Sequence, residues 1–147
     1  MHIKEILHRK GHEIETVAPD EALEYCAARM KLGRLGALVV CDAGRKLQGV
    51  ISERDIVGAL VDYGPKSLQM AASEVMDRRP VTCGPEDTVA QVAHRMTRAR
   101  VRHVPVCEDG AIVGIVSIGD IVKERFEEME LERDTLRDLA GAHLVAV

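Results

Sequence analysis

The chain has 147 residues and a formal net charge of −4, with 46% hydrophobic and 30% charged side chains. This composition is typical of one globular domain or of two closely packed halves, large enough to bury a core. Trp is absent and only one Phe and two Tyr occur, so the core must be aliphatic. The negative charge, without aromatic residues among Lys and Arg, argues against a nucleic-acid partner.

Neither membrane nor metal chemistry is indicated. No apolar leader follows Met1, and no run of 18 or more apolar residues occurs, so we expect a cytoplasmic protein with no membrane partner. The four cysteines form no Cys-x-x-Cys pair, and the six histidines lack ligand spacing. P-loop, Gly-x-Gly-x-x-Gly and Gly-x-Ser-x-Gly motifs are absent. We therefore predict no metal site and no catalytic residue.

The chain repeats itself. Residues 49–57 (GVISERDIV) return 65 positions later as residues 114–122 (GIVSIGDIV). With a shift of 66, residues 16–44 match residues 82–110 at nine positions. The one-residue difference falls in a turn, where insertions are tolerated. Two copies of a unit this long indicate two halves packed against each other rather than a solenoid.

The predicted elements follow the same order in each half. The first half has a short helix at 3–7, an extended segment at 13–17, a helix from Pro19 to Lys31, strands at 37–41 and 47–51, and a helix from Glu53. After a linker at 62–67, the corresponding segments are 72–76, 81–83, 86–97, 104–107, 112–116 and a helix from Gly119 to about Leu139. We divide the chain into repeat 1 with its linker (1–66), repeat 2 (67–123), and a C-terminal helix and tail (124–147). We interpret that last helix as a cap on the body, with a partner-binding coiled coil as the alternative.

The duplicated pattern Gly-apolar-apolar-Ser-x-x-Asp-Ile, preceded each time by a helix and a hairpin, resembles the CBS domain, named after cystathionine beta-synthase. Two such motifs in tandem form a Bateman module, and here they resemble a stand-alone protein of bacterial type. The resemblance extends from about Ile3 to about Val122. It implies an α+β fold with two pseudo-symmetric βαββα repeats packed sheet to sheet, plus the C-terminal helix. It also implies a homodimer.

The resemblance further implies a non-catalytic regulatory module that binds AMP, ADP or ATP in clefts between the repeats. A carboxylate at a helix start can accept both ribose hydroxyls, and a nearby Ser hydroxyl can donate to ribose or phosphate. These roles fall on Ser52 and Asp55 in repeat 1 and on Ser117 and Asp120 in repeat 2. The same Ser-x-x-Asp pattern also fits a helix N-cap, and this alternative stays open.

The two repeats differ where phosphate contacts are expected. Arg102, His103 and Pro105 resemble the family's basic-basic-apolar-Pro segment, and an Arg grips phosphate bidentately. Gly36 and Ala37, at the corresponding places in repeat 1, offer no such groups. Further binding candidates are Arg54 and the possible adenine walls at the first-strand ends, Thr16, Val17, Thr82 and Cys83. We expect two unequal clefts, and which one receives Arg102 is not decided by the sequence.

Three alternatives remain beside the nucleotide sensor, whose regulated protein is unknown. NAD(H) could bind in place of a mononucleotide, because its adenosine half would meet the same Ser and Asp. A structural interaction protein would use the acid-rich stretch 124–138 to dock a basic partner. An enzyme using Cys26, Cys83 or His103 is least supported, because the sequence groups no base, nucleophile and oxyanion donor together.

Overall fold

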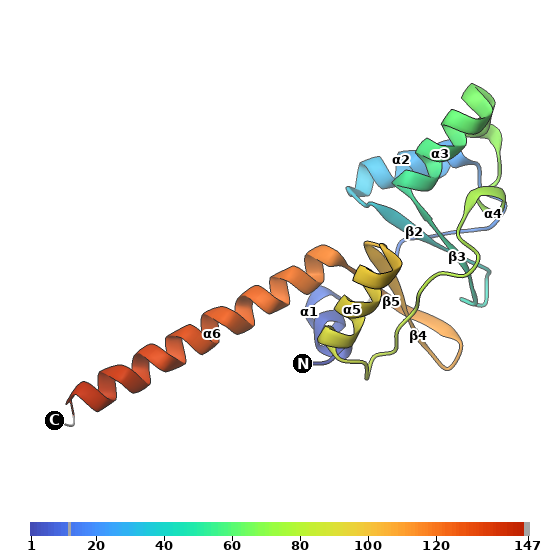
Figure 1. The fold of residues 1–147 in the computed structure, drawn as a ribbon. Coiled ribbons are helices and arrows are strands. Elements are labelled where there is room, and N and C mark those ends of the chain that lie inside the picture. Colours follow the sequence, from blue (N-terminus) through green and yellow to red (C-terminus); the bar gives the residue numbers. More distant parts are fainter. Residues whose placement is uncertain (12, 146–147) are drawn as a thin grey trace.

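The computed structural model describes residues 1–11 and 13–145, with side chains to residue 142 (Figure 1). The first half contains α1 (Ile3–Lys10), β1 (Thr16–Val17), α2 (Leu23–Gly33), β2 (Ala37–Cys41), β3 (Leu47–Ser52) and α3 (Glu53–Tyr63). The second half contains the 3-10 helix η1 (Gly64–Gln69), α4 (Ala72–Val75), α5 (Val89–Ala99), β4 (His103–Glu108), β5 (Ala111–Ser117) and α6 (Ile118–Val145).

The two halves carry equivalent small sheets. β1 pairs with β2 in parallel, and β2 pairs with β3 in an antiparallel hairpin. In the second half β4 and β5 form the hairpin, and a single parallel bridge from Cys83 to Val106 takes the place of β1. Val39, Cys41 and Ile112 form a buried cluster that joins the two sheets. The predicted α+β fold with repeats packed sheet to sheet is confirmed.

Two helices begin later than the sequence predicts. α2 starts at Leu23, and Pro19 and Asp20 form a turn instead. The Pro19 carbonyl there accepts a hydrogen bond from the Ser73 amide at 2.9 Å, so contact with the other half holds this segment out of the helix. α5 starts at Val89 because Thr88 caps it, accepting from the Gln91 amide at 3.1 Å.

The short helices α1 and α4 each pack on the half to which they do not belong in sequence. Ile3, Ile6 and Leu7 lie in the core of the second half, whereas Ala72 and Met76 lie in that of the first. The repeated glycines permit this close approach. A Cβ on Gly114 would lie 2.5 Å from Leu7 Cδ2, and one on Gly49 would lie 2.5 Å from the Asp77 carbonyl oxygen. The halves are therefore interlocked.

α6 leaves the body after a short contact region (Figure 1). Ile121 and Glu124 are buried, and Arg9 donates to Glu124 at 2.6 Å and to Glu127 at 2.9 Å. From residue 129 to residue 142 every side chain is exposed. The prediction of a capping helix is therefore wrong beyond that first contact, because this half of α6 has no body surface beneath it. Among the described residues, no helix combines the length and apolarity needed to cross a membrane.

Candidate functional site

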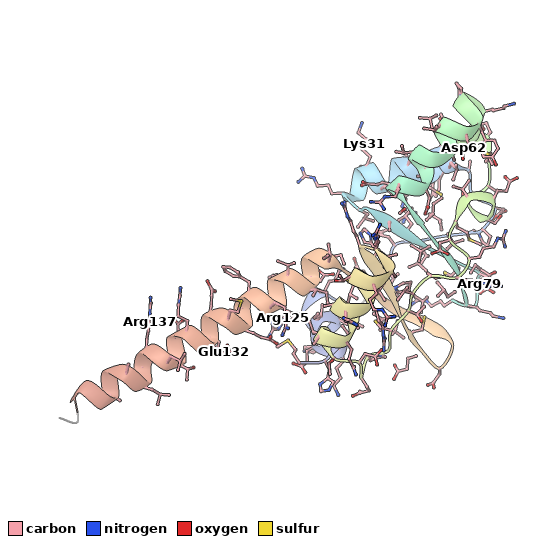
Figure 2. The ribbon with its side chains drawn as sticks, in the orientation of Figure 1. Lys31, Asp62, Arg79, Arg125, Glu132 and Arg137 are labelled. Atoms are coloured by element: carbon pink, nitrogen blue, oxygen red, sulfur yellow. The ribbon has the colours of Figure 1, made fainter. Side chains whose placement is uncertain are left out.

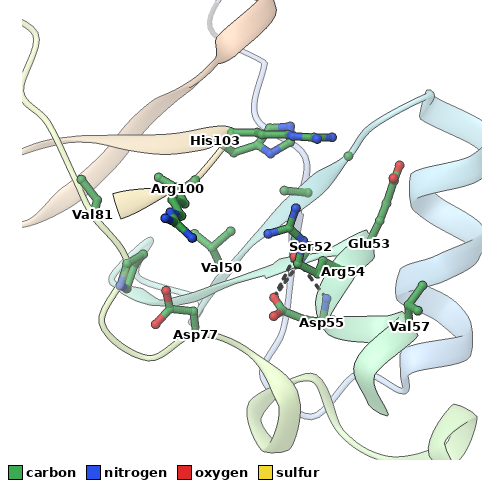
Figure 3. A pocket seen from close by; sticks show the side chains of 15 residues that line it. Val50, Ser52, Glu53, Arg54, Asp55, Val57, Asp77, Val81, Arg100 and His103 are labelled. Carbon is green, nitrogen blue, oxygen red and sulfur yellow. Dashed lines mark hydrogen bonds between the residues drawn. The ribbon is translucent and has the colours of Figure 1, made fainter. Parts of the chain in front are cut away.

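A cavity of about 550 Å³ opens between the two halves (Figure 3). Its volume lies within the range typical of small-molecule sites. The first half contributes the end of β3 and the start of α3, and the second half contributes the segment between α5 and β4. The lining residues are Gly36, Ala37, Val50, Ser52, Glu53, Arg54, Asp55, Val57, Asp77, Pro80, Val81, Arg100, Val101, Arg102 and His103.

Ser52 and Asp55 form a reciprocal cap at the start of α3, on one wall of the cavity (Figure 3). Asp55 Oδ2 accepts from the Ser52 amide at 2.9 Å and from Ser52 Oγ at 3.0 Å, and the Asp55 amide donates to Ser52 Oγ at 3.3 Å. These contacts engage only one carboxylate oxygen among the described residues. Asp55 therefore caps the helix and still offers Oδ1, with further lone pairs, to the cavity.

Basic side chains from the second half face this wall. Arg100 ends α5 in the left-handed region (φ 57°), a conformation that is unfavourable for a residue with a Cβ and that glycine usually adopts at this place. Arg102 follows, and its carbonyl accepts from the Ile118 amide at 2.8 Å, which fixes the segment beside α6. Within the described residues, neither guanidinium group nor that of Arg54 forms an ion pair. The cavity thus combines the Asp55 oxygen Oδ1 with guanidinium groups that form no ion pair within the described part of the chain.

His103 lies half-buried beside the backbone of Gly36. A Cβ at Gly36 would come within 2.8 Å of His103 Cε1, so the ring would have to shift if residue 36 carried a side chain. Burial lowers the pKa of His103, the nearby Lys10 ammonium lowers it further, and Glu53 and Asp120 oppose this. The imidazole is therefore neutral near pH 7.

The equivalent carboxylate in the second half, Asp120, already has a cation. Lys10 Nζ lies 2.8 Å from Asp120 Oδ2 and 3.0 Å from the Ile115 carbonyl oxygen. Asp120 also accepts from the Ser117 amide at 2.8 Å. Burial opposes ionisation of Asp120, but the hydrogen bonds from Lys10 and Ser117 outweigh it, so the pKa of this carboxyl is lowered. Lys10 thus removes the equivalence of the two clefts.

The structure brings together seven of the predicted binding residues around the cavity: Gly36, Ala37, Ser52, Arg54, Asp55, Arg102 and His103. Arg102 and His103 line the same cavity as Asp55, and His103 also lies near Lys10 and Asp120, which both shift its pKa. Ser117 and Asp120 lie at the Lys10 contact instead. The remaining predicted residues, Thr16, Val17, Thr82, Cys83 and Pro105, are not among those that line the cavity.

Val17 and Cys83 are core residues rather than cavity walls. Each is about 95% buried, in the first and second core respectively. Pro105 is buried within β4, where its carbonyl accepts from the Cys83 amide at 3.0 Å. Burial also raises the pKa of Cys83 to about 12, so its thiol is a poor nucleophile. Packing directs the side chains of Val17 and Cys83 into the two cores, and a role of these strand ends as an adenine wall stays a prediction.

Sequence reasoning missed several lining residues, of which Pro80, Val81 and Asp77 come from the segment after α4 and Arg100 and Val101 from the end of α5. Arg100 had a signal in the sequence, since it matches Arg34 across the repeat and lies two residues before Arg102. The others had none. Among the described residues, no group of three or more His, Cys, Asp or Glu side chains is placed to hold a metal ion.

Comparison with known proteins identifies the family. The CBS domain model matches residues 3–62 and 72–127, and the chain therefore belongs to the CBS domain family, with two tandem copies. It is 30% identical over 140 residues to the mitochondrial CBS domain-containing protein CBSX3 of Arabidopsis thaliana, covering 87% of this chain and 68% of that one.

Solved structures of other family members share the fold. The CBS-domain containing protein ATU1752 from Agrobacterium tumefaciens is 41% identical with a TM-score of 0.81, covering 85% of this chain and 99% of that one. The CBS domain pair of protein MJ0100 is 26% identical with a TM-score of 0.76, covering 87% and 98%, and its structure contains 5'-methylthioadenosine and S-adenosyl-L-methionine.

Proposed function

We propose that this protein is a non-catalytic regulatory module that binds one adenosine nucleotide in the cavity beside Asp55. The observation that carries the proposal is the division of charge across the cavity. Asp55 faces it from the first half, and the guanidinium groups of Arg100 and Arg102, which form no ion pair with any described residue, face it from the second. A carboxylate suits ribose hydroxyls, and Arg suits phosphate.

The cavity wall suggests how the ligand lies. Val50, Val57, Pro80 and Val81 provide apolar surface for a base, and the free oxygen of Asp55 is directed to the ribose. Phosphate then extends toward Arg102 and Arg100, with Arg54 as a further cation. The nucleotide would touch both halves. If it binds one relative arrangement of the halves more tightly than another, binding would stabilise the first arrangement by the difference between the two binding free energies.

The adenosine part of the proposal is supported by the MJ0100 domain pair, whose two bound compounds both contain adenosine. AMP, ADP and ATP are our preferred ligands because three guanidinium groups at one cavity favour an anion. NAD(H) remains the alternative, since its adenosine half offers the same ribose and base.

We propose one nucleotide per chain, because the ion pair with Lys10 makes the Asp120 carboxylate a weaker acceptor for ribose than that of Asp55. We also propose a homodimer. Leu60 and Val61 on α3 are 47% and 79% exposed, which leaves an apolar face available to a second copy. The regulated protein stays unidentified, and a cytoplasmic location stays a prediction, since one relative is named as mitochondrial.

Isothermal titration calorimetry of the full chain with AMP, ADP, ATP, NADH and adenosine tests the proposal. We expect micromolar binding of at least one phosphorylated ligand, weaker binding of adenosine, and a stoichiometry of one. Arg102→Ala should weaken the phosphorylated ligand but leave adenosine unchanged. Arg98→Ala, an exposed residue of α5 outside the cavity, is the matched control. Absence of heat with every ligand, or equal effects of both variants, would reject the site.

A further inference from the structure

The exposed part of α6 carries a regular seam of side chains. Val122, Phe126, Met129, Arg133, Leu136 and Ala140 follow each other at alternating spacings of four and three residues. This is the spacing of the a and d positions of a coiled coil, with Phe126, Arg133 and Ala140 at a and the others at d. The four large apolar members are 60–67% exposed, so the seam is uncovered along its length.

The seam points away from the protein's own body. α6 is attached to the body through Ile121 and Glu124, which are buried, and through Glu127, which binds Arg9. In the same heptad these residues occupy the c, f and b positions, on the side of the helix opposite to a and d. Beyond residue 128 the helix runs free of the body (Figures 1 and 2). The attachment therefore presents the seam to another molecule.

The charges beside the seam specify its partner. The g positions are Arg125 and Glu132, and the e positions that follow them are Glu130 and Arg137. In a parallel pair of two copies, Arg125 meets the partner's Glu130 and Glu132 meets the partner's Arg137, so every such pair is attractive. An antiparallel pair, which joins e to e and g to g, would oppose Glu130 to the partner's Glu130 and Glu132 to the partner's Glu132 when the two copies overlap along the whole of residues 122–140. Such charges set the partner and orientation of coiled coils.

From this pattern we propose that α6 is the docking surface for a second copy of this chain and forms a parallel, in-register two-stranded coiled coil. Arg133 fits this state, since one polar residue at an a position favours two strands and its long stem can cover the seam while the charge reaches water. A general basic partner is less favoured, because the cations of this helix are placed to match its own carboxylates. The proposal does not depend on nucleotide binding.

Cysteine cross-linking of the full chain tests the orientation directly. Met129→Cys places a thiol at a d position, where two parallel, in-register copies face each other. Leu131→Cys, at an f position, is the matched control, because Met129 and Leu131 are 67% and 69% exposed. The starting protein is treated in parallel to account for its own cysteines. Under mild oxidation we expect a disulfide-linked dimer from Met129→Cys only. No cross-link, or equal cross-linking of both variants, would overturn the proposal.

Charge reversal tests the pairing independently. Arg125→Glu places a carboxylate opposite the partner's Glu130 twice per dimer, and we expect the dissociation constant of the α6 pair to rise roughly tenfold. Adding Glu130→Arg should restore it. The yield of the Met129→Cys cross-link is the readout, because it reports the α6 pair and not association through α3. Failure of the single variant to weaken the pair, or of the double variant to restore it, would contradict the assigned register.

Discussion

Replacing Asp55 and Asp120 separately distinguishes a ribose acceptor from a helix cap. Both side chains accept a hydrogen bond from the amide of the Ser that begins their motif, at 2.9 Å for Ser52 and 2.8 Å for Ser117. Only Asp55 faces the cavity, whereas Asp120 is paired with Lys10. The variants Asp55→Ala and Asp120→Ala therefore share the loss of a cap and differ in the expected loss of ligand.

The magnitudes follow from these contacts. Loss of the cap in Asp55→Ala should cost about 1 kcal/mol of folding free energy, which lowers Tm by roughly 3 °C for a domain of this size. Asp120→Ala should cost somewhat more, because the partly exposed Lys10 pair is lost too. Hydrogen bonds from ribose to a charged acceptor contribute about 2 to 3 kcal/mol together, so Asp55→Ala should weaken nucleotide binding roughly 30- to 150-fold.

Calorimetry with the best ligand and thermal melts of the same samples provide the two readouts. We expect Asp120→Ala to be the less stable variant and yet to bind normally, while Asp55→Ala melts closer to the unmodified protein and binds poorly. Equal affinities in both variants would mean that these carboxylates act only as caps. Greater loss of binding in Asp120→Ala would place the nucleotide in the other cleft.

Three further predictions follow from single contacts. The pKa of His103 is lowered in the free protein, and a bound phosphate should raise it, so that the imidazole takes up a proton on binding. Affinity should therefore increase as the pH falls. Calorimetry in two buffers should detect this proton uptake, which should disappear in His103→Gln. Lys10→Met should raise the pKa of Asp120, which an NMR titration would measure. The lowered pKa of Asp120 stabilises the folded protein above about pH 4, and this stabilisation is lost as the pH falls through the folded-state pKa. We expect the variant to have less of this stabilisation. Gly49→Ala should cost about 1 to 3 kcal/mol, because its Cβ would lie 2.5 Å from the Asp77 carbonyl oxygen, whereas Gly58→Ala on α3, with nothing within 4 Å, should be neutral or stabilising in urea unfolding.

Some features could be predicted from the sequence because they depend on local pattern. The repeat, the two hairpins, and the start of α3 at Glu53 are local consequences of apolar alternation and of Ser-x-x-Asp capping. The candidate residues that reached the cavity, such as Asp55 and Arg102, lie next to these elements. The late start of α2 was missed because the Pro19 carbonyl bonds to Ser73, far along the chain. Helix propensity depends on residues that are close in the sequence, so it does not predict a contact between distant residues.

The sequence by itself determined the two-fold repetition, the aliphatic core and the residue types available for a nucleotide. Only the tertiary structure decided which of them meet. The crossing of α1 onto the second half brings Lys10 to Asp120, and the turn after α5 brings Arg102 and His103 to the cavity beside Asp55. The two halves carry nearly the same motif, so their difference arises from long-range packing, which no local pattern records. The seam of α6 likewise became recognisable once its opposite face was found against the body.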